Sequence, residues 1–174
     1  MIYKSKKAVA LREKVGPFDY NKNVPKPDGV KVQKMPRKQF VCGKTSENPK
    51  GSSGWEYEGE ISLEGKRHGK GAMVWTVGSF YEGWWKNDKQ HGDGRLIYCN
   101  VNSGAYFYEG WWKYGKKEGY GVERYMDGTY YKGTWKEGKR HGEGIVKLQS
   151  GDIKSGFWSQ DTLKQYTDYL GCLP

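Results

Sequence analysis

The chain has 174 residues, of which 35% are hydrophobic, below the roughly 45–50% that is usual for globular proteins. Glycine is abundant, with 26 residues, and aromatic residues reach 16%, with eight tryptophans and fourteen tyrosines. Glycine without a three-residue period excludes collagen, and a disordered chain would lack so many aromatic rings. This composition instead indicates strands in which glycine makes room for a neighbouring ring.

The net charge of +10 is concentrated near the N-terminus. The first 50 residues carry 13 lysines and arginines against four acidic residues, whereas residues 51–174 carry 17 against 16. Five of the six prolines lie in the same stretch, and proline at that density disfavours both helix and sheet. We therefore expect residues 1–54 to form an extended basic arm that is held either by the chain's own repeats or, as its charge favours, by an acidic surface of a partner.

Nothing in the sequence predicts a membrane span or a secretory signal, because no apolar run approaches about 18 residues. The start, MIYKSKKAVALREK, is basic, so mitochondrial targeting stays open as an alternative. The three cysteines, Cys42, Cys99 and Cys172, lack CxxC spacing. This argues against a disulfide framework or a zinc site and fits a reducing compartment.

After the arm the sequence repeats at intervals of 23 to 27 residues. Four units begin at Tyr57, Tyr81, Tyr108 and Tyr131, and a partial fifth unit begins at Lys154. Such a period predicts one supersecondary unit stacked on its neighbours. Segments such as YEGWWK alternate with period two and predict strands, while ND, YG and EG predict two-residue turns. Each unit is therefore predicted to be a β-hairpin, and residues 55–158 to form one elongated antiparallel sheet.

The pattern Y-x-G-x-W-x-x-G-x-x-H-G-x-G, closed by a later Gly, resembles the MORN repeat family from Tyr57 to about Trp158. Ile61, Asp88 and Glu118 depart from it, standing where Trp, Gly and His are expected. The resemblance implies a mainly β fold and a non-enzymatic scaffold with protein partners in a large eukaryotic assembly, in a ciliary axoneme or the cytoskeleton. The alternatives that stay open are a peripheral membrane module for anionic phospholipids and an accessory subunit of a mitochondrial complex.

Counting from the two-residue turn of the second unit places Gly83 opposite Gly92 and Tyr81 opposite Gly94, on one face of the sheet. This face holds aromatic rings over glycines and is the predicted core. Its predicted members are Tyr81, Gly83, Trp85, Gly92, Gly94, Leu96, Tyr98, Tyr108, Trp112, Tyr125, Tyr131, Trp135, Val146 and Leu148.

The three histidines, His68, His91 and His141, fall at one place in the repeat, on the other face. Equivalent positions in neighbouring hairpins lie about 10 Å apart, too far for two imidazoles to share a metal ion at about 2 Å per bond. The residues opposite them differ, so no common base or nucleophile is expected. We therefore expect no catalytic, cofactor or metal site, and interpret the histidines as structural residues near the turns.

Two features predict binding. Tryptophans on the face away from the core are predicted to contact a partner protein, namely Trp84 and Trp111, with Phe157 in the same phase. The alternative is that the chain's own arm or its C-terminal helix covers these two tryptophans. Basic residues at the hairpin tips are predicted to face an acidic protein or anionic lipid: Lys66, Arg67, Lys89, Lys116, Lys117, Lys139 and Arg140. Nucleic-acid binding is not expected, because it rests on the charge of the arm alone.

Residues 159–174 are predicted to form a short helix, because Leu163, Tyr166 and Leu170 follow helical spacing. Such a helix would cap the sheet by covering its last strand, whose open edge otherwise invites aggregation.

Overall fold

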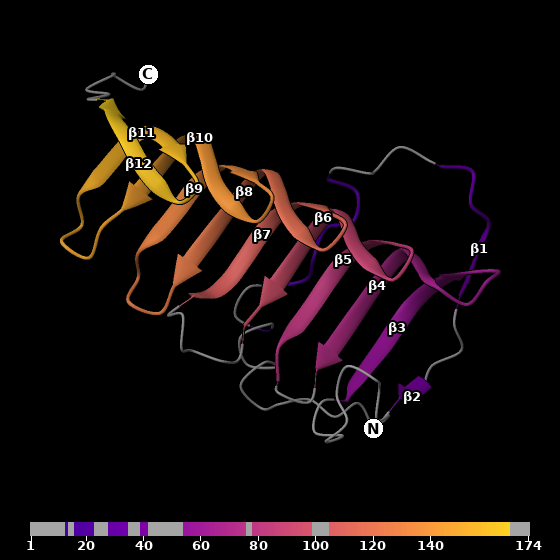
Figure 1. Cartoon of the computed structure of the whole chain (residues 1–174). Coiled ribbons are helices and arrows are strands. Elements are labelled where there is room, and N and C mark those ends of the chain that lie inside the picture. Colours follow the sequence, from indigo (N-terminus) through magenta and orange to yellow (C-terminus); the bar gives the residue numbers. More distant parts are fainter. Residues whose placement is uncertain are drawn as a thin grey trace.

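The computed structural model describes residues 13, 16–22, 28–34, 39–41, 54–75, 78–98 and 105–167. Twelve strands form one antiparallel sheet, which Figure 1 shows as a long row running from β3 to β12. The strands are β1 (Val32–Lys34), β2 (Gln39–Val41), β3 (Trp55–Ser62), β4 (Arg67–Trp75), β5 (Phe80–Lys86), β6 (Lys89–Ile97), β7 (Ala105–Lys113), β8 (Lys116–Tyr125), β9 (Tyr130–Lys136), β10 (Lys139–Lys147), β11 (Ile153–Ser159) and β12 (Thr162–Thr167). The predicted mainly β fold of stacked hairpins is confirmed.

Five hairpins follow one another along the chain, and each strand from β3 onward pairs with the next. Four of them turn on two residues that both have positive φ, which is the geometry of a type I′ turn. These turns are Asn87–Asp88, Tyr114–Gly115, Glu137–Gly138 and Gln160–Asp161. The first three are the ND, YG and EG turns predicted from the sequence, and the fourth is additional.

A bulge in the second hairpin corrects the predicted register. Gly83 pairs with Gly94 rather than with Gly92, because the hairpin ladder is interrupted at Trp84 on one strand and at residues 91–93 on the other. The shift is by two residues, so every side chain stays on its predicted face. Gly92 lies in the bulge with φ of 75°, a left-handed conformation that glycine adopts at little cost. The glycine after each histidine is therefore a requirement of the bulge.

The core is a ladder of alternating tyrosine and tryptophan rings on one face, here called the aromatic face. Successive ring centroids lie 5.0–5.6 Å apart and the rings meet edge to face, at 79–89°. The ladder runs Tyr57, Trp85, Tyr81, Trp112, Tyr108, Trp135, Tyr131, Trp158. Such pairs contribute about 0.5–1.5 kcal/mol each beyond the area they bury, so the ladder ties each hairpin to the next.

Glycines form the floor beneath the tyrosine rings, as predicted. A methyl carbon added at Gly94 would lie 2.6 Å from Cζ of Tyr81, far inside contact distance. The same holds for Gly144 beneath Tyr131. The indole of Trp85 completes the packing by donating from Nε1 to the carbonyl of Gly71 at 3.1 Å.

Two short strands of the arm cover the outer edge of the sheet. β1 pairs with residues 60–62 of β3, and β2 pairs with residues 55–57 of the same strand. Figure 1 shows β1 beside β3 at the end of the row. These two strands of the arm therefore extend the chain's own sheet, although the arm was expected to lie along a partner.

The predicted C-terminal helix is wrong for residues 162–167, which form β12 and pair with β11. The turn at Gln160–Asp161 sends the chain back along β11, where the main-chain groups of that strand offer hydrogen bonds that a helix would leave unmade. Residues 168–174, with Leu170, lie outside the described residues, as do the three cysteines and the basic start. Within the described ranges no helix is long and apolar enough to cross a membrane.

Candidate partner-binding face

Residues 16–22, here called the strap, lie on the sheet face opposite the aromatic ladder, here called the strap face. Phe18 is buried, and the guanidinium carbon of Arg95 lies 5.6 Å from its ring centroid. Tyr20 donates its hydroxyl to a main-chain carbonyl of β4 at 3.2 Å and meets the Trp84 ring edge-on, with 6.4 Å between centroids. The strap thus covers the part of this face formed by β4 to β7.

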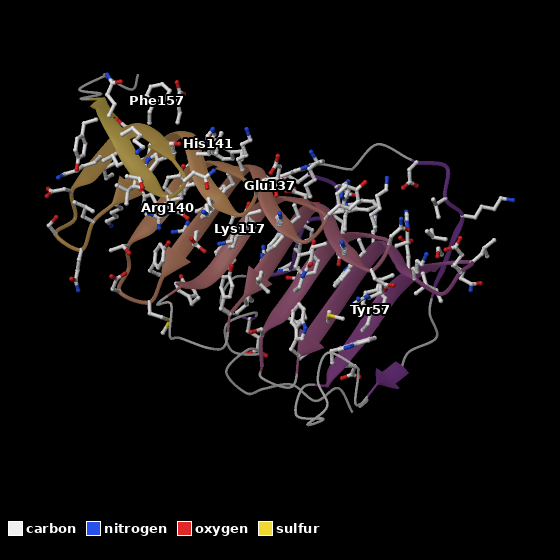
Figure 2. The ribbon with its side chains drawn as sticks, viewed as in Figure 1. Tyr57, Lys117, Glu137, Arg140, His141 and Phe157 are labelled. Atoms are coloured by element: carbon white, nitrogen blue, oxygen red, sulfur yellow. The ribbon has the colours of Figure 1, made fainter. Side chains whose placement is uncertain are left out.

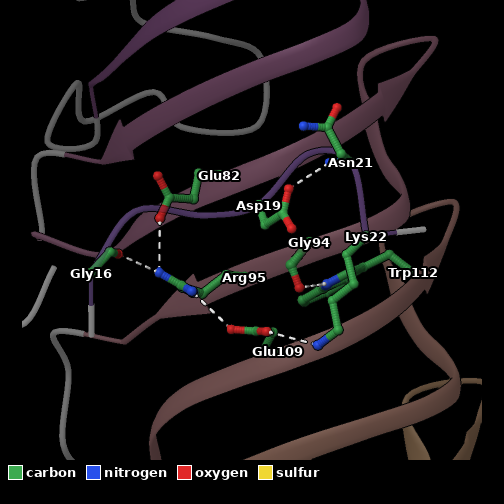
Figure 3. A network of polar contacts seen from close by, with 9 residues as sticks. All are labelled: Gly16, Asp19, Asn21, Lys22, Glu82, Gly94, Arg95, Glu109 and Trp112. Atoms are coloured by element: carbon green, nitrogen blue, oxygen red, sulfur yellow. Dashed lines mark hydrogen bonds and ion pairs between the residues drawn. The ribbon is translucent and has the colours of Figure 1, made fainter. Parts of the chain in front are cut away.

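A buried guanidinium fastens the strap to the sheet, as Figure 3 shows. Arg95 donates to the carboxylates of Glu82 at 3.3 Å and Glu109 at 2.9 Å. It also donates to the carbonyl of Gly16 at 2.7 Å, and Lys22 lies 3.7 Å from Glu109. Because Arg95 and Glu82 are both buried, loss of either would leave an uncompensated charge in the interior of this cluster.

A second polar contact holds the arm further along, at Asp28. Its carboxylate oxygen lies 3.0 Å from Nζ of Lys86 and 3.2 Å from Nε2 of His68. The hydrogen bond from Lys86 is the main cause that lowers the pKa of Asp28 to about 2, with smaller contributions from the amide of Val30 and from His68. The arm is therefore fixed to the sheet by charge as well as by ring packing.

The structure separates the three aromatic residues that were predicted to bind a partner. Trp84 is half-buried against Tyr20, so the chain's own strap occupies its surroundings. Trp111 is half-buried and lines a groove of about 800 Å³, which is also lined by Lys22, the last residue of the strap. Phe157, labelled in Figure 2, is 43% exposed on β11. Trp111 and Phe157 thus remain on the part of the strap face that the strap leaves open.

Three of the seven basic tip residues turn over the aromatic face, two of which Figure 2 labels at neighbouring hairpins. Their charged groups lie 4.4–5.2 Å from the centroid of a tryptophan ring. These residues are Arg67, Lys117 and Arg140. Lys117 is also ion-paired with the buried carboxylate of Glu123, while burial lowers the pKa of Lys117. Each of the three stabilises the sheet by a cation–π contact.

Of the other four tip residues, two form ion pairs with glutamates and two do not. Lys66 forms an ion pair with Glu64, and Lys116 forms one with Glu137 of the next hairpin. The remaining two, Lys89 and Lys139, are exposed and make no ion pair with any described residue. The predicted row of free cations at the hairpin tips is therefore reduced to these two.

The three histidines occupy the bulges of their hairpins. In each of them, His68, His91 and His141, the Nδ1 atom is buried without a hydrogen-bond partner in the described structure. Burial lowers the pKa of His91, whose ring lies 4.9 Å from that of Tyr114. In the described ranges no group of three or more His, Cys, Asp or Glu side chains is placed to hold a metal ion.

The sequence left open that the chain's own arm covers Trp84 and Trp111, but it did not single out residues 16–22 as the strap, although the segment GPFDYNK carries a signal. Phe18 and Tyr20 are two residues apart, so in an extended chain both rings point to the same side. Two large rings in an otherwise basic, proline-containing segment would be costly to leave in water, which indicates that the segment packs on a surface. The partner of that packing, Arg95 between two glutamates, has no signature in the sequence.

A comparison with protein families matches four MORN repeats, at residues 57–80, 81–100, 108–130 and 131–153, which together span just over half of the chain. A search of curated proteins gives no match. The structure continues the array with a fifth hairpin, β11–β12, beyond the last matched residue. MORN repeats are structural repeats that are generally involved in contacts with other proteins or with membrane lipids. The chain belongs to the MORN-repeat family.

Proposed function

We propose that this protein is a non-enzymatic scaffold that binds another protein within a larger assembly. The main support for the proposal is that most of the basic residues at the hairpin tips are already in contact with other residues of the chain. Five of the seven are engaged within the sheet, by ring contacts or ion pairs. A surface for lipid headgroups needs cations that are free to reach the membrane, and Lys89 and Lys139 alone make a weak one.

The position of two large aromatic side chains also supports the proposal. Trp111 and Phe157 lie on the strap face, away from the ladder that builds the core. Large rings on a rigid sheet are typical of protein-binding surfaces, because they bury much area with little loss of side-chain entropy. The histidines lie in the bulges of their hairpins, so we interpret them as structural residues.

The place of the scaffold in the cell is part of the proposal. A ciliary axoneme or another cytoskeletal structure of a eukaryotic cell is suggested by the family resemblance, and the basic arm suits a partner with an acidic surface. A mitochondrial complex is the alternative suggested by the basic start. At the hairpin tips, the lipid alternative is left with the two free lysines, Lys89 and Lys139.

Two parallel measurements test the proposal. The tagged full-length chain is cross-linked in cells of its source organism, and the cross-linked peptides are identified by mass spectrometry. The purified chain is also floated with vesicles that contain phosphatidylserine, with Lys89→Glu/Lys139→Glu as the matched variant. We expect cross-links to a protein partner that persist at moderate salt, and no flotation.

The opposite result would replace the scaffold with a membrane module. That result is flotation that the double charge reversal abolishes, together with an absence of reproducible protein cross-links. Steep loss of binding with salt would point the same way, because exposed cations bind headgroups through screened electrostatics.

A further inference from the structure

The strap face continues past the end of the strap onto β8–β11, and this continuation is here called the open face. Four large apolar side chains are exposed there, at 37–63% of their surface. They are Tyr120, Ile145, Ile153 and Phe157. On β4–β7 the equivalent surface is covered, since Phe18 of the strap is buried against it. The strap therefore covers one half of this sheet face, whereas no described segment covers the other half.

Cations alternate with these apolar side chains across the open face. Val122 pairs with Lys132, and Lys132 with Ile145, so the three lie side by side in one row. Arg124 and Lys147 flank Tyr130 in the next row. The pattern is a row-by-row mixture of apolar and positive groups.

These cations have no acidic partner in the described structure. Arg124 meets only the ring of Tyr130, at 5.8 Å, and neither Lys132 nor Lys147 forms an ion pair with a described residue. In the covered half, by contrast, Arg95 is held between two carboxylates. Glu143 lies in the row of Phe157, but this one carboxylate is outnumbered by Arg124, Lys132 and Lys147, so these rows together carry net positive charge.

The strap shows how an extended segment sits on this sheet. Phe18 and Tyr20, two residues apart, both place their rings on the sheet. The main-chain carbonyl of Gly16 accepts a hydrogen bond from the side chain of Arg95. Lys22, at the end of the strap, lines the groove of about 800 Å³ together with Trp111 and Tyr120. A second segment that followed the path of the strap would therefore pass from this groove onto the open face.

We propose, building on the scaffold function above, that the open face binds an extended acidic segment of a different protein. Its aromatic or aliphatic side chains, at alternate positions, lie against Tyr120, Ile145 and Phe157. Its carboxylates pair with Arg124, Lys132 and Lys147. A second copy of this chain is the poorer occupant, because its arm is strongly basic and would meet the open face with like charge.

Selection from a random dodecapeptide phage library on the immobilised full-length chain tests the proposal. We expect enriched peptides to carry several carboxylates and at least two large apolar residues at alternate positions. Their binding is then measured by fluorescence anisotropy on the wild type and on Arg124→Glu/Lys132→Glu/Lys147→Glu. We expect the affinity to fall by about tenfold or more, because attraction to acidic groups becomes repulsion.

The matched control is Lys89→Glu/Lys139→Glu, which changes charge at the hairpin tips and should leave peptide binding unchanged. A second test, Tyr120→Ser/Phe157→Ser, removes apolar contacts and should weaken the same peptides. Circular dichroism confirms that each variant keeps its sheet. The proposal fails if no peptide is enriched, if the enriched peptides are not acidic, or if the triple variant binds them as tightly as the wild type.

Failure here is distinguishable from failure of the scaffold function. If native protein cross-links persist in the triple variant while peptide selection fails, the scaffold stands and its partner uses another surface. If phosphatidylserine vesicles bind the wild type and the triple variant does not float, the open face is a lipid surface, and the proposal is overturned in favour of that ligand. Native cross-links lost in the triple variant, with peptide binding lost alongside, support the open face as the docking site.

Discussion

The hydroxyl of Tyr81 donates a hydrogen bond to the main-chain carbonyl of Trp84 at 3.0 Å. Trp84 lies in the bulge, where the ladder of the hairpin is interrupted. The leading tyrosine of each other matched repeat makes the same bond three residues along, at 2.8–3.1 Å: Tyr57 to Glu60, Tyr108 to Trp111 and Tyr131 to Thr134. The repeated tyrosine is therefore both a core ring and the group that holds the bulge.

Replacing Tyr81 by Phe keeps the ring and removes only this hydrogen bond. We expect the free energy of unfolding to fall by about 1–2 kcal/mol, because a carbonyl beside the core loses its donor. Urea unfolding followed by tryptophan fluorescence measures the change. Tyr114→Phe is the control, since that side chain is 50% exposed at a turn. Equal effects of the two substitutions would show that the bond to the bulge contributes nothing.

Gly144 tests the glycine floor. A methyl carbon there would lie 2.6 Å from Cζ of Tyr131, so Gly144→Val should destabilise the chain by about 1–3 kcal/mol through overpacking. The neighbouring Glu143→Val places the same side chain on the exposed opposite face and should be much milder. Thermal melts of the two variants compare them directly. Asp93 and Gly94 make a poorer pair, because Asp93 is itself buried.

The sheet was predictable because its signals are local. Period-two alternation, two-residue turns and repeated glycines place Tyr81, Trp85 and Leu96 on the aromatic face without knowledge of any distant contact. The bulge escaped the prediction because a two-residue shift changes no face and therefore leaves no trace in the hydrophobic pattern. The expected helix failed at Leu163 and Tyr166 for a related reason, since two residues three apart also fit an irregularly paired strand.

The binding residues were less predictable, because their state depends on segments far apart in the sequence. Trp84 and Trp111 occupy equivalent positions in adjacent repeats, yet only Trp84 meets a residue of the strap, 64 positions away in the chain. Arg67 and Lys66 are neighbours in one tip, yet alternation sends Arg67 over the Trp85 ring. Local pattern gives the side on which a residue lies, while tertiary contacts decide whether it is free.

Phe18→Ala should release the strap without unfolding the sheet. The buried ring contributes about 2 kcal/mol of apolar burial, and the strap holds few other apolar contacts, so its detachment is a local event. We expect faster proteolysis of the arm and greater quenching of Trp84 fluorescence by acrylamide, with the melting of the sheet nearly unchanged. Val30→Ala is the control, because Val30 is 43% exposed. A sheet that melts together with the strap would show that the strap belongs to the core.

The contact of Asp28 with Lys86 and His68 predicts a pH dependence at the acid end. Hydrogen bonding to Lys86 lowers the pKa of Asp28 from 3.8 to about 2 in the folded chain. A lowered carboxyl pKa stabilises the folded state above pH 4, and this contribution is lost as the pH falls from about 4 to about 2. We expect the carboxyl carbon of Asp28 to titrate near pH 2 by NMR, and proteolysis of the arm by pepsin to rise over the same interval. Lys86→Met removes the main cause, so the midpoint should move up toward 3.8 and the arm should open at higher pH. A midpoint near 3.8 in the wild type would show that the arm is not held at this point.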